Sequence, residues 1–223
     1  MSALVSAPLF TGSPASTGDL RAFTKLENGE SATIVAYGTS LTEMGGWVDI
    51  LRETLEERHP GQVQVINSGG SGQYSQWGVD NLDAKVIAHA PDLVFIEFSV
   101  NDCVARFGCS VDQARQNLES MIDRIQDKYP DCEFVLMSTS IADKYPEGHT
   151  SHRTQIEAYH QIYADVARER GFLFIDLFTA WQELKTSDLV RYEAAIPDTI
   201  HPSPMGEEKV VAPAILSALD LAR

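Results

Sequence analysis

Short runs of apolar and β-branched residues recur along the chain. Each run holds four to seven residues, and each is followed at once by a small or polar residue. Runs of this length and composition predict strands that are buried on both faces of a sheet. The five runs are 32–37, 63–66, 92–98, 133–138 and 172–175.

Between these runs, apolar residues recur every three or four positions, which predicts amphipathic helices. The pattern is clearest in 47–58, 118–125 and 156–166. A last helix is expected from 205 to 221. Pro213 lies inside it and is expected to kink it or divide it in two, because proline lacks the backbone N–H that a helix needs.

The alternation of strands and helices predicts the fold class. Strands separated by helices of 10–15 residues imply βαβ units and a parallel sheet covered on both faces. Five such strands favour a flavodoxin-like three-layer α/β/α sandwich with a five-stranded parallel sheet. We expect one domain over residues 31–223, since no repeat or linker divides it, and a surface-wrapping extension over residues 1–30, which are rich in Gly, Pro, Ser and Thr.

Composition narrows the possible partners. Of 223 residues, 43% are hydrophobic and 22% are charged, which is typical of a globular protein. The net charge of −15 would repel phosphate backbones and anionic lipid headgroups, so neither nucleic acid nor a membrane is expected as a partner. The acidity would suit a cationic ligand, but its simpler interpretation is that it keeps the protein in solution.

Cysteine usage and the N-terminal sequence bear on the compartment. The three cysteines form no C-x-x-C pair and leave one over, so a disulfide framework is not expected and a reducing compartment fits better. Residues 1–10 lack a basic segment followed by a continuous apolar one, so no secretory signal is predicted. No apolar run approaches the ~20 residues that span a bilayer. We therefore expect a cytoplasmic protein.

Candidate chemistry follows the predicted strands. Ligands of an open parallel sheet bind beyond the carboxyl ends of its strands. A serine, a glycine-rich turn and an asparagine follow the first three runs, and an Asp-x-x-His pair precedes the last predicted helix. Acyl transfer needs such a set: a nucleophile, oxyanion donors, a base and a carboxylate that orients the base.

These four segments resemble the conserved blocks of the SGNH (GDSL-like) hydrolase family. In order, they are similar to the GDSL, N-x-G-x-x-G, G-x-N-D and D-x-x-H blocks, and they are 38–41, 67–72, 99–102 and 198–201. The resemblance implies the family's fold and an ester hydrolase that needs no metal or organic cofactor.

The resemblance also implies a role for each matching residue. Ser40 would be the nucleophile, His201 its general base and Asp198 the group that fixes the imidazole. The oxyanion hole would consist of the backbone N–H groups of Ser40 and Gly72 and the side-chain amide of Asn101.

Two positions depart from the family pattern. Thr39 stands where the family has Asp, and Ser99 stands where it has Gly. Neither supplies an atom to the implied mechanism, but the hydrogen bonding around Ser40 and the wall beside Asn101 are left open. The residues around Ser40 also lack the second glycine of a G-x-S-x-G elbow, which argues against an α/β-hydrolase fold.

Several residues have simpler interpretations. His149 and His152 have the spacing of a metal-binding helix face, but they lie in a polar segment with Pro146 and Gly148, which predicts a loop. Cys103 is expected to be a small buried residue and Trp47 to be part of the core. Glu97 falls within an apolar run, so it needs a hydrogen-bond donor if it is buried. The glycines of 68–72 do not match a nucleotide-binding motif.

The expected substrate is a small-molecule ester with a short acyl group, in particular an O-acetyl group on a carbohydrate. The segments expected at the carboxyl edge of the sheet, 103–110, 142–150 and 182–197, are short or polar and suit a sugar better than a fatty chain. A lysophospholipase or thioesterase is the alternative enzyme, and a catalytically silent carbohydrate-binding protein is an alternative of another class. The oligomeric state is left open.

Overall fold

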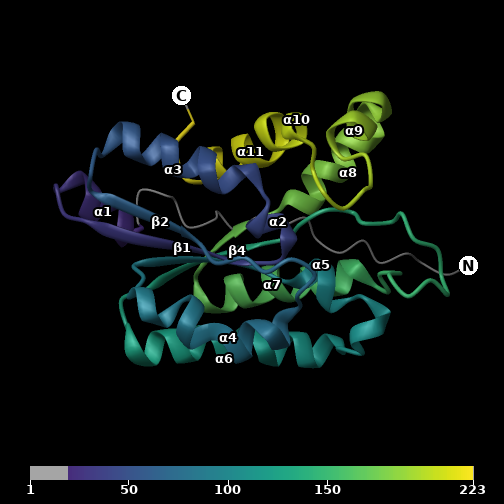
Figure 1. Ribbon diagram of the computed structural model, residues 1–223, viewed down its shortest axis with the longest axis horizontal. Coiled ribbons are helices and arrows are strands. Elements are labelled where there is room, and N and C mark those ends of the chain that lie inside the picture. Colours follow the sequence, from purple (N-terminus) through teal and green to yellow (C-terminus); the bar gives the residue numbers. More distant parts are fainter. Residues whose placement is uncertain (1–19, 223) are drawn as a thin grey trace, which may run out of the picture.

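The computed structural model describes residues 20–222, which contain one parallel sheet of five strands (Figure 1). The strands lie in the order β2-β1-β3-β4-β5, so β1 and β3 are neighbours at its centre. They are β1 (Ala32–Gly38), β2 (Val63–Asn67), β3 (Leu93–Glu97), β4 (Glu133–Met137) and β5 (Leu173–Ile175). The predicted three-layer α/β/α sandwich is confirmed.

Helices cover both faces of the sheet, as Figure 1 shows. One layer contains α1 (Arg21–Glu27), α3 (Gly46–Arg58), α8 (Leu177–Ser187), α9 (Leu189–Ala195), α10 (Pro204–Gly206) and α11 (Ala212–Ala218). The opposite layer contains α4 (Ser75–Lys85), α6 (Val111–Lys128) and α7 (Ile156–Arg170). The short helices α2 (Ser40–Glu43) and α5 (Ser99–Asp102) follow the carboxyl ends of β1 and β3, and the 3-10 turns η2 (Ile87–His89) and η3 (Ala105–Phe107) lie in loops.

Alternating side chains of the central strands build the two halves of the core. In β1, Ile34 and Ala36 pack with α3 and α11, whereas Val35 and Tyr37 pack with α4 and α6. Such strands are apolar at every position because both of their faces are covered.

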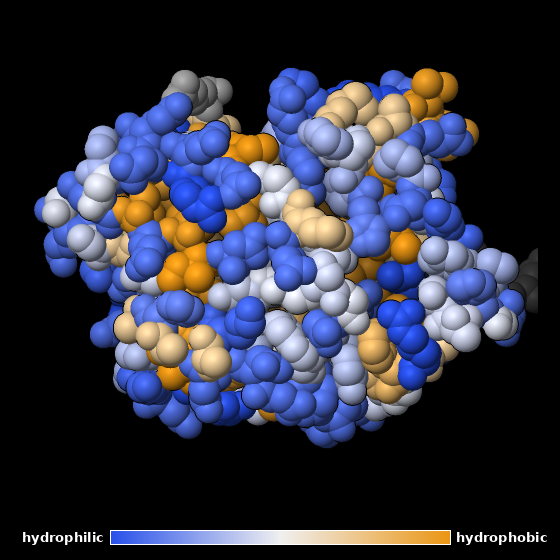
Figure 2. Space-filling model, viewed as in Figure 1, coloured by the Kyte–Doolittle hydropathy of each residue, from blue (hydrophilic) through white to orange (hydrophobic). Residues whose placement is uncertain are grey.

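The expectation that every strand is buried on both faces is wrong for β2. Only Val65 of β2 is buried, and Gln64 and Asn67 are exposed. β2 is an edge strand, and hydrophobic residues appear along this side of the molecule in Figure 2 among a mostly hydrophilic surface.

The last helical segment is neither simply kinked nor split. A π-helical stretch, η4 (Glu207–Val211), joins α10 to α11, and Pro213 lies in the first turn of α11. The Ala212 N–H bonds to the Glu207 carbonyl five residues earlier, so the regular i→i−4 pattern is already interrupted where Pro213 lacks an N–H.

The N-terminal segment differs from the expected extension where the structure describes it. Residues 21–27 form α1, whose Ala22 and Leu26 are buried in the core beside β1. Lys25 binds Asp92 at 2.8 Å, and Glu133 accepts a hydrogen bond from the backbone of Ala22. Residues 1–19 lie outside the described part. Within residues 20–222, no helix is both long enough and apolar enough to cross a membrane.

Candidate active site

Ser40 is the first residue of α2, directly beyond the carboxyl end of β1. Thr39 has extended backbone angles and caps this helix, with its Oγ1 accepting a hydrogen bond from the Leu41 N–H at 3.2 Å. The Ser40 side chain is mostly buried, and its Oγ lies 3.0 Å from Nε2 of His201. The hydroxyl is therefore in direct hydrogen-bond contact with an imidazole that is 161 residues away in the sequence.

Asp198 binds the imidazole of His201 at Nδ1, the ring nitrogen that does not contact Ser40. Its Oδ2 lies 2.8 Å from His201 Nδ1, and its Oδ1 accepts the backbone N–H groups of Ile200 at 2.9 Å and His201 at 2.6 Å. Although partial burial acts to raise it, the hydrogen bonds from His201 and Ile200 hold the pKa of Asp198 below its ordinary value. An ionised Asp198 accepts the Nδ1–H, which leaves Nε2 as the acceptor for Ser40.

A left-handed residue shapes the Asp-x-x-His turn. Thr199 has φ 62°, which is uncommon for a β-branched residue. Its carbonyl accepts the N–H of Ala142 at 2.8 Å, and its Oγ1 accepts the N–H of Lys144 at 3.0 Å. The loop after β4 therefore fixes the turn that carries Asp198 and His201.

Asn101 lies in α5, beyond the carboxyl end of the neighbouring strand β3. Its Nδ2 donates to the carbonyl of Gln73 at 2.7 Å. Gly72 directly precedes Gln73 and has φ +70°, a left-handed conformation that glycine adopts without strain. The loop that contains Gly72 is tied to the nucleophile segment, because Gly70 N–H donates to the Gly38 carbonyl at 2.9 Å and Ser71 N–H donates to Glu43 at 2.8 Å.

A small apolar cluster joins the segments that carry these residues. It contains Leu41, Val100 and Ile200, which are the sequence neighbours of Ser40, Asn101 and His201, together with Ala142. All four are buried. The structure thus brings together Ser40, His201, Asp198 and Asn101, and it places the Gly72 loop against Asn101.

Thr39, which stands where the family has Asp, is hydrogen-bonded to Glu97 at the end of β3. The Glu97 carboxylate accepts the Thr39 N–H at 2.6 Å, the Thr42 hydroxyl at 2.7 Å and the Thr39 hydroxyl at 3.1 Å. Burial raises the pKa of Glu97 to about 7, although the hydrogen bonds from Thr42 and Thr39 oppose this. The hydrogen-bond donors that buried Glu97 needs are therefore Thr39 and Thr42, which flank Ser40 and Leu41 in the turn that carries the nucleophile.

Ser99, which stands where the family has Gly, is hydrogen-bonded to a buried histidine of α7. Ser99 Oγ lies 2.8 Å from His160 Nδ1, and His160 Nε2 lies 3.3 Å from the carbonyl of Ser140. Burial lowers the pKa of His160 to about 4, so its ring is neutral, with Nε2 donating and Nδ1 accepting. This contact ties α5, which carries Asn101, to α7.

A cavity of about 20 Å³ lies behind Leu41, between the sheet and the layer of α3 and α8. Its walls are mostly apolar, but Glu97, Glu207, Thr139 and Ser140 also line it. Burial raises the pKa of Glu207 to about 7, and its carboxylate accepts the Trp47 N–H at 3.1 Å. The volume and the polar groups suit about one water molecule.

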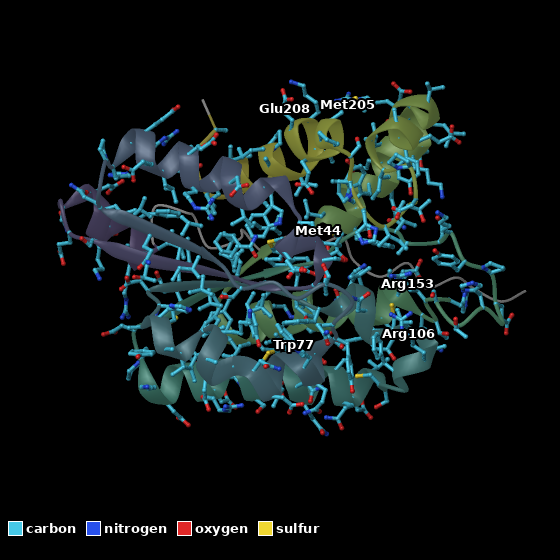
Figure 3. The ribbon with its side chains drawn as sticks, viewed as in Figure 1. Met44, Trp77, Arg106, Arg153, Met205 and Glu208 are labelled. Carbon is cyan, nitrogen blue, oxygen red and sulfur yellow. The ribbon has the colours of Figure 1, made fainter. Side chains whose placement is uncertain are left out.

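Three segments form the rim beside Asn101: the turn before α4, η3 and the loop after β4. Tyr74 and Phe107 stack with ring centroids 4.4 Å apart, and Tyr145 and His149 stack at the same distance. Exposed Arg106 lies over the Phe107 ring, and Figure 3 shows Arg106 and Arg153 on the same side of the molecule.

The simpler interpretations of four other residues agree with their positions. His149 and His152 lie in an irregular loop, and His152 Nδ1 is 2.8 Å from the carbonyl of Tyr145. Trp47 is buried in the core. Cys103 is buried, which raises the pKa of its thiol to about 12.

Sequence reasoning missed residues that support the site from other elements. Neither His160 nor Arg153 has a motif around it, and Arg153 donates to both Val100 and Asn101. One signal did exist: an acidic residue inside an apolar run, Glu97, indicated a specific buried partner.

Comparisons with known proteins agree with this geometry. The model of the GDSL-like lipase/acylhydrolase family matches residues 29–209. An arylesterase of Vibrio mimicus is 27% identical over 158 residues, which are 71% of this chain and 70% of the relative. Esterase TesA of Pseudomonas aeruginosa is 26% identical over 144 residues, 65% of this chain and 66% of the relative.

A solved structure supports the fold. An acetylxylan esterase from Geobacillus stearothermophilus has a TM-score of 0.73 and 21% identity, covering 87% of this chain and 98% of that chain. The family model covers most of the chain, including all four blocks found in the sequence. The chain therefore belongs to the GDSL-like lipase/acylhydrolase family and is a carboxylic ester hydrolase.

Proposed function

We propose that this protein hydrolyses short-chain carboxylic esters, in particular O-acetyl groups on carbohydrate, through an acyl-enzyme on Ser40. The observation that carries the proposal is the continuous chain of contacts from Asp198 through His201 to Ser40, at 2.8 and 3.0 Å. A serine hydroxyl bound to an imidazole that is oriented by a carboxylate is the arrangement that activates serine as a nucleophile.

In the first half-reaction, Ser40 Oγ forms a bond to the ester carbonyl carbon while His201 Nε2 takes the hydroxyl proton. The carbonyl π electrons move to oxygen, where the N–H groups of Ser40 and Gly72 and the amide of Asn101 stabilise the charge. The C–O bond to the alcohol then breaks, and the leaving oxygen takes the proton from His201. Asp198 stays ionised and stabilises the imidazolium.

In the second half-reaction, water takes the place of the alcohol. His201 removes a proton from water as its oxygen bonds to the acyl carbon, and the proton then returns to Ser40 Oγ when the acyl bond breaks. The products are a carboxylic acid and the free enzyme, so the cycle needs no cofactor.

The surroundings of Ser40 support a short acyl group and a polar alcohol. The segments 103–110, 142–150 and 182–197, which would have to supply an apolar acyl channel, are short or polar. The rim carries stacked aromatic rings at Tyr74 and Tyr145. Aromatic faces beside polar groups suit a sugar, and one structural neighbour is an acetylxylan esterase.

The test combines a nucleophile variant with a panel of substrates. We expect the wild-type enzyme to cleave p-nitrophenyl acetate and acetylated xylo-oligosaccharides, with kcat/KM falling beyond the butyryl ester. Ser40→Ala should lower kcat by at least about 10⁴-fold. The matched control is Ser71→Ala, an exposed serine of the adjacent loop, which should change kcat less than about twofold.

Other outcomes would favour the alternatives. Faster cleavage of octanoyl or longer esters than of acetyl esters would overturn the carbohydrate proposal in favour of a lysophospholipase or thioesterase. Binding of acetylated oligosaccharide without any turnover by the wild type would identify a catalytically silent carbohydrate-binding protein.

A further inference from the structure

Arg153 contacts two consecutive residues of the short helix that carries Asn101. It lies in the loop between β4 and α7, where its backbone pairs with Val104 in an isolated β-bridge. Its Nε donates to the Val100 carbonyl at 2.9 Å, and its Nη2 donates to Asn101 Oδ1 at 3.4 Å. A third donor, Nη1, contacts the carbonyl of Ser151 at 3.2 Å.

These contacts determine how the Asn101 amide can be oriented. A side-chain amide has one acceptor oxygen and two N–H donors. The Gln73 carbonyl accepts one N–H at 2.7 Å, and Arg153 donates to the oxygen. A flipped amide would place its oxygen against the Gln73 carbonyl and its NH₂ group against the guanidinium, so both contacts would become repulsive. One orientation remains, in which the second N–H is available to a ligand.

The charge on Arg153 is not neutralised by a direct partner. Among residues 20–222, no ion pair joins Arg153 or its neighbour Arg106 to an aspartate or glutamate. Burial holds the pKa of Arg153 below its ordinary value; Arg106 also lowers it, while Cys103, Tyr145 and Asp198, which is itself bound to His201, act to raise it. A hydrogen bond from an uncompensated cation to an amide oxygen polarises the amide and makes its N–H groups stronger donors.

We propose that Arg153 is a positioning residue for the oxyanion donor: it locks the orientation of the Asn101 amide and strengthens its free N–H toward the developing negative charge. This inference rests on the proposed function, in which Asn101 donates to the oxyanion. Arg153 itself does not touch the reacting atoms.

The test is a double-mutant cycle on kcat for p-nitrophenyl acetate. Asn101→Ala should lower kcat by roughly 10²–10³-fold, as expected for the loss of a side-chain oxyanion donor. Arg153→Met should lower kcat by about tenfold with little change in KM, which is the effect of one hydrogen bond to a charged group. In the Asn101→Ala background, Arg153→Met should have less than about a twofold effect, because a residue that acts through Asn101 has nothing left to position.

Arg106→Met is the matched control. It removes a neighbouring guanidinium that contacts Ser151 Oγ and the Phe107 ring but not Asn101, so kcat should stay within about twofold in both backgrounds. An equal loss from Arg153→Met with and without Asn101 would overturn the proposal. So would a rise in KM at unchanged kcat, which would make Arg153 a substrate-binding residue.

Two further measurements cover the remaining outcomes. If Arg153→Met does not fold, Arg153→Lys replaces it in the cycle, since lysine keeps the charge but not the planar fork. The side-chain amide signals of Asn101, followed by NMR, should shift in the Arg153 variant and not in Arg106→Met, and unchanged signals would also overturn the proposal. Failure of the proposed function is separate, because it would show as no loss of turnover in Ser40→Ala.

Discussion

Glu97 beneath the nucleophile turn makes the stability of this enzyme depend on pH in an unusual direction. Burial raises the pKa of Glu97 to about 7 from its ordinary 4.5. The folded state therefore holds the Glu97 proton more tightly than the unfolded state does. Its contribution to stability is fully present below pH 4.5, falls between pH 4.5 and 7 and is lost above pH 7.

The perturbation that isolates this effect is Glu97→Gln. Glutamine keeps an acceptor for the Thr39 N–H and does not titrate, and its amide can donate to the Thr39 or Thr42 hydroxyl. A pKa change of this size corresponds to about 2–3 kcal/mol between pH 5 and pH 8. The unfolding free energy of Glu97→Gln minus that of the wild type should therefore rise by about 2–3 kcal/mol from pH 5 to pH 8.

Urea unfolding followed by tryptophan fluorescence measures the difference at each pH. The other charged groups facing Glu97 are Asp102, whose pKa burial also raises to about 7, and Glu207 across the cavity. Both are present in the wild type and the variant, so their main contributions cancel in the difference. Glu53→Gln, on the exposed face of α3, is the control and should track the wild type. The reasoning would be refuted if the unfolding free energy of Glu97→Gln relative to the wild type did not change with pH, or if it rose toward low pH.

Three more predictions concern the walls of the site. Asn101→Ala should lower kcat by roughly 10²–10³-fold with KM little changed, and a tenfold rise in KM at unchanged kcat would instead make Asn101 a substrate-binding residue. Gly38→Ala should lower Tm and activity together, because its Cβ would lie under 3.0 Å from both the carboxylate and the carbonyl of Glu97; wild-type Tm would contradict this. Ser99→Gly should cost about 1–3 kcal/mol of stability in urea unfolding, since His160 Nδ1 loses its donor, and an unchanged stability would show that the contact contributes nothing.

Most of the sheet and the Ser40–His201–Asp198 set could be predicted from the sequence because their signals are local. A central strand is apolar throughout, Ser40 follows the end of the first strand by two residues, and Asp198 and His201 are only three positions apart. The edge position of β2 also had a local signal, because Gln64 and Asn67 interrupt its apolar residues. A seven-residue helix such as α1, with only two buried residues, gives too weak a pattern to be separated from a loop.

The supporting contacts could not be predicted because their partners are distant in the sequence. Thr39 and Glu97 are 58 positions apart, Ser99 and His160 are 61 apart, and Asn101 and Arg153 are 52 apart. The pairs meet only when the fold brings together β1, β3, the loop after β4 and α7. Local periodicity carries no information about that order.

The pairing of Thr39 with Glu97 leads to a last prediction, that restoring the family's aspartate at position 39 will damage this enzyme. Asp could cap α2 as Thr39 does, by accepting the Leu41 N–H. An ionised Asp side chain cannot donate to Glu97, however, and the Thr39 hydroxyl now lies 3.1 Å from both carboxylate oxygens.

Two buried carboxylates at this distance cannot both be ionised, so one must stay protonated or the turn must move. We expect Thr39→Asp to lose several kcal/mol of stability at pH 8 and most of its kcat, because Ser40 is the next residue on that turn. At pH 5, where a shared proton relieves the repulsion, the loss should be smaller.

Glu97→Gln supplies the decisive comparison, because its amide can donate to the new carboxylate. In the Thr39→Asp background it should restore at least half of the lost stability at pH 8. A Thr39→Asp enzyme as stable as the wild type at pH 8, or a Glu97→Gln effect that is equal in both backgrounds, would show that the two positions are not coupled and that Thr39 is no more than a helix cap.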